Sequence, residues 1–204
     1  THSCAPLHAA AVRSPAGAAG AGEAAERKVG AGEAGEIGAG EIVLLPAPSG
    51  HGKSTLAAAL VAAGWDYLGD EAIGVRPATL TAVGYPKRLA LDAASRKALG
   101  LDATDLPETQ PEELRPEVVR LDGDVGPIGR VVLPRYVEGA EPTLEVLDPA
   151  EAIVEILANT LNLARSGQGG LTAVCDLAAA VPVYRLTHSD APAAVDLLLL
   201  RLGV

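Results

Sequence analysis

The sequence predicts an α/β domain built around a mixed β-sheet, and three observations lead to this prediction. The chain has 204 residues, which is enough for a single domain with a sizeable core. Residues 41–46 form a short apolar run typical of a buried strand, and residues 54–63 are strong helix formers followed by Gly64 as a C-terminal cap. Elsewhere strand and helix patterns mix without strict alternation, which favours a mixed sheet over a doubly wound one.

The first forty residues predict a strand followed by a long insertion. Residues 7–13 read as the strand. Residues 14–40 are of low complexity: GAGEAAE at Gly20 recurs as GAGEAGE at Gly30 and as GAGE at Gly38. Because Gly, Ala and Glu offer almost nothing to pack, we expect a flexible, solvated insertion, with a partner-binding segment as the alternative.

The segment after the first helix predicts short strands and a second helix. Residues 65–75 divide into a strand, a polar turn at 69–71 and another strand. Residues 80–91 read as strand and turn. Residues 92–100 begin with an aspartate suited to an N-cap and end with a glycine, so they predict a short helix.

The second half of the chain predicts the remaining strands and the C-terminal helices. Asp148 followed by Pro149 is a typical helix start, with an N-cap and a proline in the first turn. The expected order is a loop over 104–116, strands over 118–121, 130–133 and 143–147, a helix from Asp148 with apolar positions as far as Leu163, a glycine-rich turn over 167–170, a helix to Ala180, a strand over 183–186 and a last helix from Asp190.

Charge and composition exclude several classes of partner. The net charge is −10 and the lysines and arginines are scattered, which argues against nucleic acid or an anionic membrane as the main partner. No apolar run approaches the ~18 to 20 residues that span a bilayer, and the first residues lack the pattern of a secretory signal. Cys4 and Cys175 have no metal or redox spacing, so we expect free thiols and a cytoplasmic protein.

Residues 47–54, APSGHGKS, are almost a phosphate-binding loop. The pattern G-x-x-x-x-G-K-[ST] fits except that Ala47 replaces its first glycine. Such a loop wraps backbone N–H groups around a phosphate at the N-terminus of the next helix. Gly50 and Gly52 allow the close approach or positive φ that the loop needs, and alanine is tolerable at the first position if its φ stays negative.

The loop supplies the candidate nucleotide-binding residues. Lys53 can reach the β- and γ-phosphates, and the hydroxyl of Ser54 can ligate Mg²⁺. The imidazole of His51 faces either solvent or the nucleotide. The candidate set for binding the nucleotide is Pro48, Ser49, Gly50, His51, Gly52, Lys53, Ser54 and Thr55.

Asp70 and Glu71 form a second candidate feature, because two adjacent acids follow a short apolar strand downstream of the loop. A carboxylate here can hold Mg²⁺ or accept the proton of an attacking hydroxyl, and a solvated acidic turn is the alternative. A lone histidine on a strand, such as His8, is more often a packed or hydrogen-bonded core residue. We expect His188 at the surface and a structural role for Asp66.

Taken together, three motifs resemble those of the HPr kinase/phosphorylases. They are the histidine strand 8–12 (HAAAV), the phosphate loop 47–54 and the acid motif 68–73 (LGDEAI). The nearest similarity is to the short HPr-kinase-related proteins of bacterial biosynthetic clusters, among them lasso-peptide tailoring kinases. The resemblance covers residues 6–90. This sequence departs from the family at three points. Ala47 replaces the first glycine of the loop, and Glu71 stands where the bifunctional enzymes have aspartate. The E-x-R-G-x-G signature of the dephosphorylating reaction is not found.

The resemblance implies a phosphate-loop kinase fold of the HPr kinase/phosphoenolpyruvate carboxykinase type and an ATP-dependent transfer to a serine of a protein or precursor peptide. Asp70 would be the general base, Lys53 would bind the phosphates, and Ser54 with Glu71 would hold Mg²⁺. His8 would then lie beside the catalytic site. It also suggests a homo-oligomer. The alternatives are a kinase of small-molecule hydroxyls on the same scaffold and a non-catalytic, nucleotide-binding regulatory module.

Overall fold

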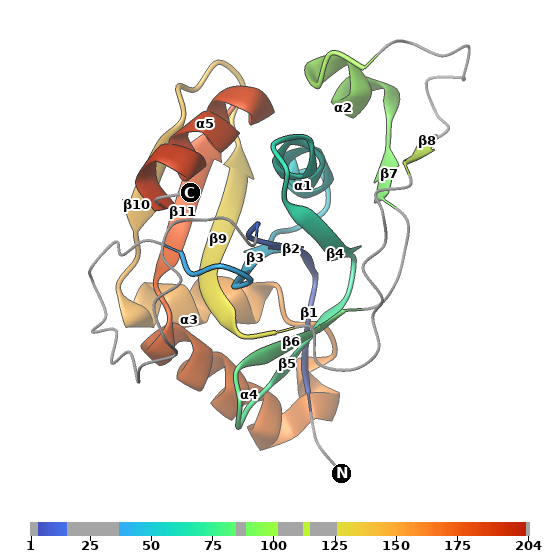
Figure 1. The fold of residues 1–204 in the computed structure, drawn as a ribbon. Helices are drawn as coiled ribbons and strands as arrows, with labels where there is room; N and C mark the ends of the chain where they lie inside the picture. Colours follow the sequence, from blue (N-terminus) through green and yellow to red (C-terminus); the bar gives the residue numbers. More distant parts are fainter. Residues whose placement is uncertain (1–3, 16–36, 85–88, 102–111, 115–125, 203–204) are drawn as a thin grey trace.

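A six-stranded mixed sheet forms the centre of the structure, a computed structural model that describes residues 4–15, 37–84, 89–101, 112–114 and 126–202 (Figure 1). The strand order is β10-β11-β9-β3-β2-β4. Strands β3, β9 and β11 run parallel, whereas β2 and β10 are antiparallel to their neighbours, so the predicted mixed sheet is confirmed. The strands are β2 (Ala9–Arg13), β3 (Ile42–Pro46), β4 (Asp66–Asp70), β9 (Ile128–Tyr136), β10 (Thr143–Val146) and β11 (Val183–His188).

Helices α1 (Lys53–Ala62) and α5 (Ala191–Leu202) cover one face of this sheet. The alternation of side chains along β3 explains how both faces are buried: Val43 and Leu45 pack with the α1 and α5 residues, and Ile42 and Leu44 pack on the other side. A strand buried on both faces reads as a continuous apolar run, which is why residues 41–46 could be recognised.

The opposite face is covered by α3 (Pro149–Ala158), α4 (Leu163–Ala180) and a small second sheet (Figure 1). The small sheet has the order β1-β5-β6 and consists of β1 (Ala5–Leu7), β5 (Ile73–Arg76) and β6 (Thr81–Gly84). Beside α1 lie helix α2 and a two-stranded pair; these are α2 (Ala93–Ala98), β7 (Leu89–Leu91) and β8 (Glu112–Leu114). The fold therefore has three layers, with the large sheet in the middle.

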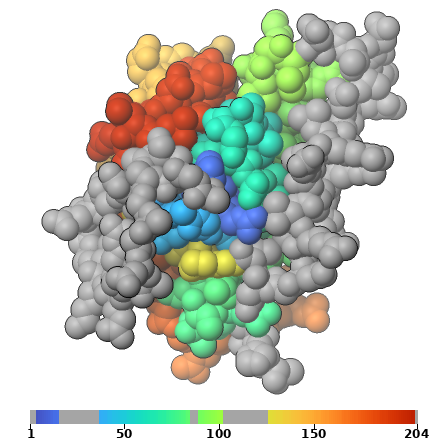
Figure 2. Space-filling model, viewed as in Figure 1, coloured from blue at the N-terminus to red at the C-terminus, as the bar shows by residue number. Residues whose placement is uncertain are grey.

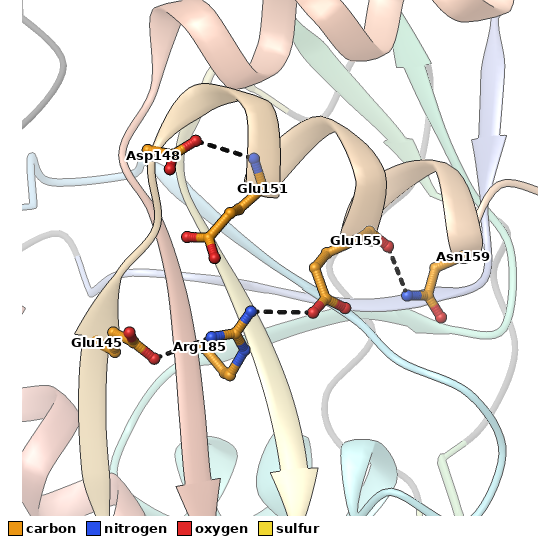
Figure 3. A network of polar contacts seen from close by, with 6 residues as sticks. All are labelled: Glu145, Asp148, Glu151, Glu155, Asn159 and Arg185. Carbon is orange, nitrogen blue, oxygen red and sulfur yellow. Dashed lines mark hydrogen bonds and ion pairs between the residues drawn. The ribbon is translucent and has the colours of Figure 1, made fainter.

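A polar network holds α3 against the sheet (Figure 3). Arg185 of β11 donates to Glu145 of β10 at 2.9 Å and to Glu155 of α3 at 3.0 Å. Asp148 caps the helix by accepting from the amide of Glu151 at 3.0 Å, as its place before Pro149 predicts. Both glutamates are well exposed, so each ion pair contributes about 1 kcal/mol or less. The network orients α3 more than it stabilises the fold.

Most predicted helix boundaries are confirmed. The chain leaves α1 through Gly64 with φ of 96°, and Asp92 caps α2 by accepting from the amide of Ser95 at 2.7 Å. The predicted glycine-rich turn is a break at Gly167, where φ is 55° and ψ is −146° within α4. The helix that starts after Asp148 ends at residue 158, short of the predicted Leu163, because the chain reverses through a left-handed Asn162 with φ of 51°.

The strand predicted over residues 7–13 is wrong at one position, since it breaks at His8. Strands β1 and β2 on either side belong to different sheets. The amide of His8 donates to the carbonyl of Asn159 at 2.8 Å, and its carbonyl accepts from the amide of Ala47 at 3.3 Å. These bonds take His8 out of the strand ladder and connect it to the start of the phosphate loop.

Two further boundaries differ from the prediction. The polar turn expected at 69–71 begins later, because β4 continues through Asp70, which pairs opposite Ala10. The loop expected over 104–116 is wrong at residues 112–114, which pair with β7 as β8. The rest of that loop and the predicted strand 118–121 lie outside the described residues.

The insertion expected over residues 14–40 is packed at both ends. The Ile37 side chain is completely buried with the residues of α5, and its amide donates to the carbonyl of Leu202 at 2.8 Å. The hydroxyl of Ser14 is buried and donates to the carbonyl of Gly38 at 2.7 Å. The expectation of a flexible insertion that offers almost nothing to pack is therefore wrong for Ser14 and Ile37, and residues 16–36 lie outside the described part of the chain.

Two expectations from composition can be compared with the structure. Cys4 and Cys175 are free thiols, as their spacing predicts. Among the helices that the structure describes, none combines the length and apolar character needed to cross a membrane.

We expect Ile37→Ala to lower the free energy of unfolding by about 2–5 kcal/mol, because it removes a fully buried side chain and leaves a cavity. Urea denaturation measures this difference. Leu200→Ala is the matched control: Leu200 is 79% exposed, so its truncation should change the free energy by about 0.5 kcal/mol or less. Equal effects of the two substitutions would contradict the packing of Ile37.

Candidate active site

The candidate active site lies at one edge of the large sheet. Strands β3, β9 and β11 are parallel, and β4 has the same direction because β2 is antiparallel to both β3 and β4. Their carboxyl ends therefore meet at one edge, where open α/β sheets bind ligands. The register of β2 places Ala9 opposite Pro46 and Ala10 opposite Asp70. His8, the phosphate loop and Asp70 thus come together from three adjacent strands.

The loop has the backbone conformation that its glycines predict. Gly50 and Gly52 have φ of 82° and 81°, in the left-handed region that favours glycine. Ala47 is not among the described non-glycine residues with positive φ, so the alanine in place of the first glycine carries no such strain. Its side chain is buried at the end of β3. The departure from the glycine pattern is therefore compatible with the loop.

Helix α1 starts at Lys53 directly after the loop. Gly52 is its N-cap residue, no side chain caps the first turn, and the carbonyl of Gly52 accepts from the amide of Leu56 at 2.8 Å. The amides of the first turn thus have no side-chain acceptor. Such a helix end carries a partial positive charge and donors directed at one point, which suits a phosphate.

Lys53 and Asp70 form a buried ion pair beside the loop. Lys53 Nζ lies 3.0 Å from Asp70 Oδ1, and the side chains are only 8% and 7% exposed. Removing one partner of such a pair typically costs about 3–5 kcal/mol, since it leaves an uncompensated buried charge. The structure thus brings together the two residues that the sequence assigns to phosphate binding and to base chemistry.

His8 belongs to the same electrostatic neighbourhood. Burial lowers the pKa of His8 and the positive charge of Lys53 lowers it further, whereas Asp70 and Glu71 act in the opposite direction. Burial also raises the pKa of Tyr67, and the charges of Asp70 and Glu71 add to this shift. The side chain of Glu71 is exposed in the turn after β4. The predicted residues therefore converge around Lys53.

A cleft of about 510 Å³ opens over the loop and the start of α1. Helices α5 and α2 lie on either side of α1 (Figures 1 and 2). Residues of both helices line the cleft. Thr55 contacts the α2 side directly, donating from its hydroxyl to that of Ser95 at 2.8 Å. The described lining residues are Pro48, Ser49, Gly50, Gly52, Lys53, Ser54, Thr55, Ala90, Asp92, Ala94, Ser95, Ala98, Tyr136, His188, Ser189 and Ala191.

The predicted site residues divide into two groups around this cleft. All of the predicted loop residues line it except His51. His8, Asp70 and Glu71 are not part of its described lining. Because Lys53 both lines the cleft and bonds to Asp70, it is the residue that joins the two groups.

His188 is the residue that the sequence reasoning placed wrongly. It is 2% exposed, not at the surface, and stands at the end of β11. Its ring packs edge-on against Tyr136, with centroids 6.2 Å apart and planes at 87°. The available signal was its position two residues after the predicted strand 183–186 and two residues before Asp190, where the last helix is predicted to start. This position indicates a site residue only if β11 lies parallel to β9, because the carboxyl end of β11 then lies at the same edge of the sheet as the loop.

A magnesium ion here would take oxygen ligands. Within the described ranges, no group of three or more His, Cys, Asp and Glu side chains could hold a metal ion. Mg²⁺ typically uses one or two protein oxygens together with substrate phosphates and waters, so it does not need such a cluster. Ser54, at the first turn of α1 and in the cleft, fits this requirement, whereas Glu71, the carboxylate that the resemblance implies, is not part of the described lining.

Comparison with known protein families and with curated proteins finds no match to this chain.

We expect Gly52→Ala to damage the loop more than Gly50→Ala. Both positions have φ near +80°, where alanine costs about 1–2 kcal/mol. At Gly52 the new Cβ would also lie 3.3 Å from Cε1 of His188, whereas at Gly50 no atom lies within 4 Å. Urea denaturation should give the highest free energy of unfolding for the wild type, a lower one for Gly50→Ala and the lowest for Gly52→Ala. Equal losses would show that His188 does not restrict Gly52.

The partly buried His8 and the buried His188 should make the fold sensitive to mild acid. Burial lowers the pKa of both His8 and His188, so the unfolded chain takes up protons first as the pH falls below ~6.5. The free energy of unfolding should therefore be insensitive to these groups above that pH and decline below it. His188→Gln should reduce the decline measured by urea denaturation between pH 7.5 and 5, conditions chosen to span ~6.5. If His188→Gln leaves the pH dependence of the free energy of unfolding unchanged, the lowered pKa of His188 would be contradicted.

Proposed function

We propose that this protein is an ATP-dependent kinase that transfers the γ-phosphate of Mg·ATP to the hydroxyl of a serine in a protein or peptide. The observation that carries the proposal is the ion pair between Lys53 and Asp70. The distance from Lys53 Nζ to Asp70 Oδ1 is 3.0 Å, both side chains are almost completely buried, and the pair lies beside a loop of the phosphate-binding type. A phosphate-binding cation and a candidate base are thus held together before any substrate arrives. In a site that only bound a nucleotide, Asp70 would serve to compensate the buried charge of Lys53, so activity of Asp70 variants separates the two functions.

The loop and α1 would hold the donor. Amides around Gly50 and Gly52 and the start of α1 supply hydrogen bonds to the phosphates, and Lys53 supplies the positive charge. The bound phosphate chain would draw Lys53 away from Asp70, since its oxygens carry more negative charge than one carboxylate. Mg²⁺, when bound by Ser54 and Glu71, would offset the charge on the phosphates.

The transfer would use Asp70 as the base. The carboxylate accepts the proton of the serine hydroxyl while its oxygen forms a bond to the γ-phosphorus. The bond from the γ-phosphorus to the bridging oxygen breaks, and ADP leaves with that electron pair. Asp70 already forms an ion pair as a carboxylate, which is the form that accepts a proton.

The acceptor class rests on the resemblance to the HPr kinase-like family. Its three motifs lie here on adjacent strands: His8 before β2, the loop after β3 and Asp70 at the end of β4. Family members phosphorylate a serine of a protein, and the cluster-encoded relatives a serine of a precursor peptide. The exposed side chain of Glu71, next to Asp70, supports an acceptor that approaches from the surface.

We expect Mg·ATP to stabilise the fold. A ligand at about 100 times its dissociation constant adds ~2.7 kcal/mol. For a chain of this size the melting temperature should rise by roughly 5–10 °C. Lys53→Ala should abolish most of the shift relative to its own ligand-free form, whereas Lys97→Ala, on the exposed surface of α2, should keep it. A wild-type protein that neither ATP nor GTP stabilises would remove the nucleotide site.

Asp70→Asn should separate nucleotide binding from chemistry. The amide keeps the size of the side chain but accepts no proton, so phosphoryl transfer should fall by roughly 10²–10⁴-fold. Binding of ATP should persist, because the variant no longer competes with the phosphates for Lys53. Calorimetry measures the binding, and ATP hydrolysis followed by transfer to candidate serine peptides measures the rate.

Glu71→Gln is the matched comparison for this experiment. If Glu71 helps to hold the metal, its loss should be partly rescued by raising the Mg²⁺ concentration, and the loss in Asp70→Asn should not. Transfer at the wild-type rate by Asp70→Asn would contradict the mechanism. The nucleotide-binding regulatory module would then be the better account.

A further inference from the structure

Much of the cleft is not explained by phosphate binding. The loop and the start of α1 line one part of it. The rest lies between a face of α2 and the ends of β9 and β11. It is lined by Ala90, Asp92, Ala94, Ser95, Ala98, Tyr136, His188, Ser189 and Ala191. We refer to this part as the outer cleft.

The charge of the outer cleft does not suit a phosphate chain. Lys53 is the one Lys or Arg among the described lining residues, and it belongs to the loop. Asp92, in the outer cleft, is acidic. An extended polyphosphate would therefore carry its negative charge past described lining residues that add no further Lys or Arg, which is unfavourable. A neutral group joined to the phosphates would fit this surface better.

The shape and chemistry of the walls suit a flat, polar-edged group. Ala94 and Ala98 are four residues apart, so they present two methyl groups on one face of α2. On the other side, Tyr136 is 49% exposed and packs edge-on against His188. Aromatic and methyl surfaces favour a planar base, and the total volume of about 510 Å³ lies within the ~300–1,000 Å³ usual for small-molecule sites.

His188 provides a second, independent indication of a ligand. Both of its ring nitrogens are buried, and among the described residues no side chain hydrogen-bonds to them; the backbone of Asp190 is the polar group that interacts with the ring. Leaving a buried polar group unpaired costs about 1–3 kcal/mol, so such groups require an explanation. The ring lies against the phosphate loop, because a Cβ on Gly52 would be 3.4 Å from its Nε2. A ligand bound on the loop would therefore reach this imidazole.

We propose that the outer cleft binds the nucleoside part of the phosphate donor, with its base between Tyr136 and α2 and its ribose hydroxyls hydrogen-bonded to His188. The donor is then a nucleoside triphosphate and not an inorganic polyphosphate. This inference rests on the proposed function of the loop as a phosphate site. His188 itself lines the cleft, so a ribose on this surface lies beside its ring.

The protonation state of His188 agrees with this assignment. Burial lowers its pKa, and the nearby Asp190 acts in the opposite direction without cancelling the effect. The ring is therefore neutral at pH 7, with one nitrogen that donates and one that accepts. A neutral imidazole matches a hydroxyl, which both donates and accepts, better than it matches a phosphate oxygen.

The test compares Mg·ATP with Mg·tripolyphosphate by isothermal titration calorimetry. The wild type should bind Mg·ATP at least about 10-fold more tightly, the equivalent of one or two good contacts. Ala98→Leu should fill the outer cleft and His188→Ala should remove the ribose contact. Both should weaken Mg·ATP by about 10-fold or more and change Mg·tripolyphosphate by less than about 2-fold.

Two controls keep the outcome interpretable. Ala98 is exposed, so Ala98→Leu should fold even if the buried His188→Ala does not. Ala93→Leu makes the same substitution on α2 outside the described lining of the cleft, and it should leave both affinities unchanged. Melting temperatures of the ligand-free variants identify any that fail to fold.

Three results would overturn the inference. Equal affinity of the wild type for the two ligands would show that the nucleoside makes no contact. Equal weakening of both ligands by His188→Ala, or an unaffected Mg·ATP affinity in Ala98→Leu, would place the nucleoside elsewhere. Failure of the wild type to bind either ligand would instead reject the phosphate site itself, and with it this subsite.

Discussion

The register of β2 between β3 and β4 is the constraint on which the site depends. It sets the start of β2 against the ends of its two neighbours, so that Ala9 faces Pro46 and Ala10 faces Asp70. A slip of one residue would turn every side chain of β2 to the other face of the sheet. Because residues 9–11 are all alanine and both faces of β2 are buried, the larger buried side chain of Val12 and the hydrogen-bonded pairing with β3 and β4 distinguish this register from a slipped one. The packing that stabilises the fold thus also aligns the site.

This register also brings Asp70 of β4 beside Lys53 at the start of α1, where the two side chains form an ion pair. In the free protein each charge compensates the other inside the fold, where neither could remain alone without a cost of several kcal/mol. A phosphate on the loop would replace Asp70 as the partner of Lys53 and leave the carboxylate free to act as a base. In the proposed kinase, this one contact would compensate both charges in the resting state and release Asp70 for the reaction.

The part of the site that could be predicted consists of residues marked by short-range sequence patterns. The loop glycines, the helix after them and the acid at residue 70 form short-range patterns, and the structure places them together as expected. Ile37 and His188 could not be assigned in this way. The burial of Ile37 depends on a contact with α5 at the other end of the chain, and that of His188 on the parallel pairing of β11 with β9. Such long-range pairings leave no local pattern in a single sequence.

The most direct test of the account is a crystal structure with a non-hydrolysable ATP analogue and Mg²⁺. We expect the β-phosphate on the loop amides and Lys53 bonded to a phosphate oxygen. Asp70 should be released from Lys53 and face the γ-phosphate. Lys53 still paired with Asp70, with the phosphates bound elsewhere or not at all, would contradict the claim that this pair is the centre of a phosphoryl-transfer site.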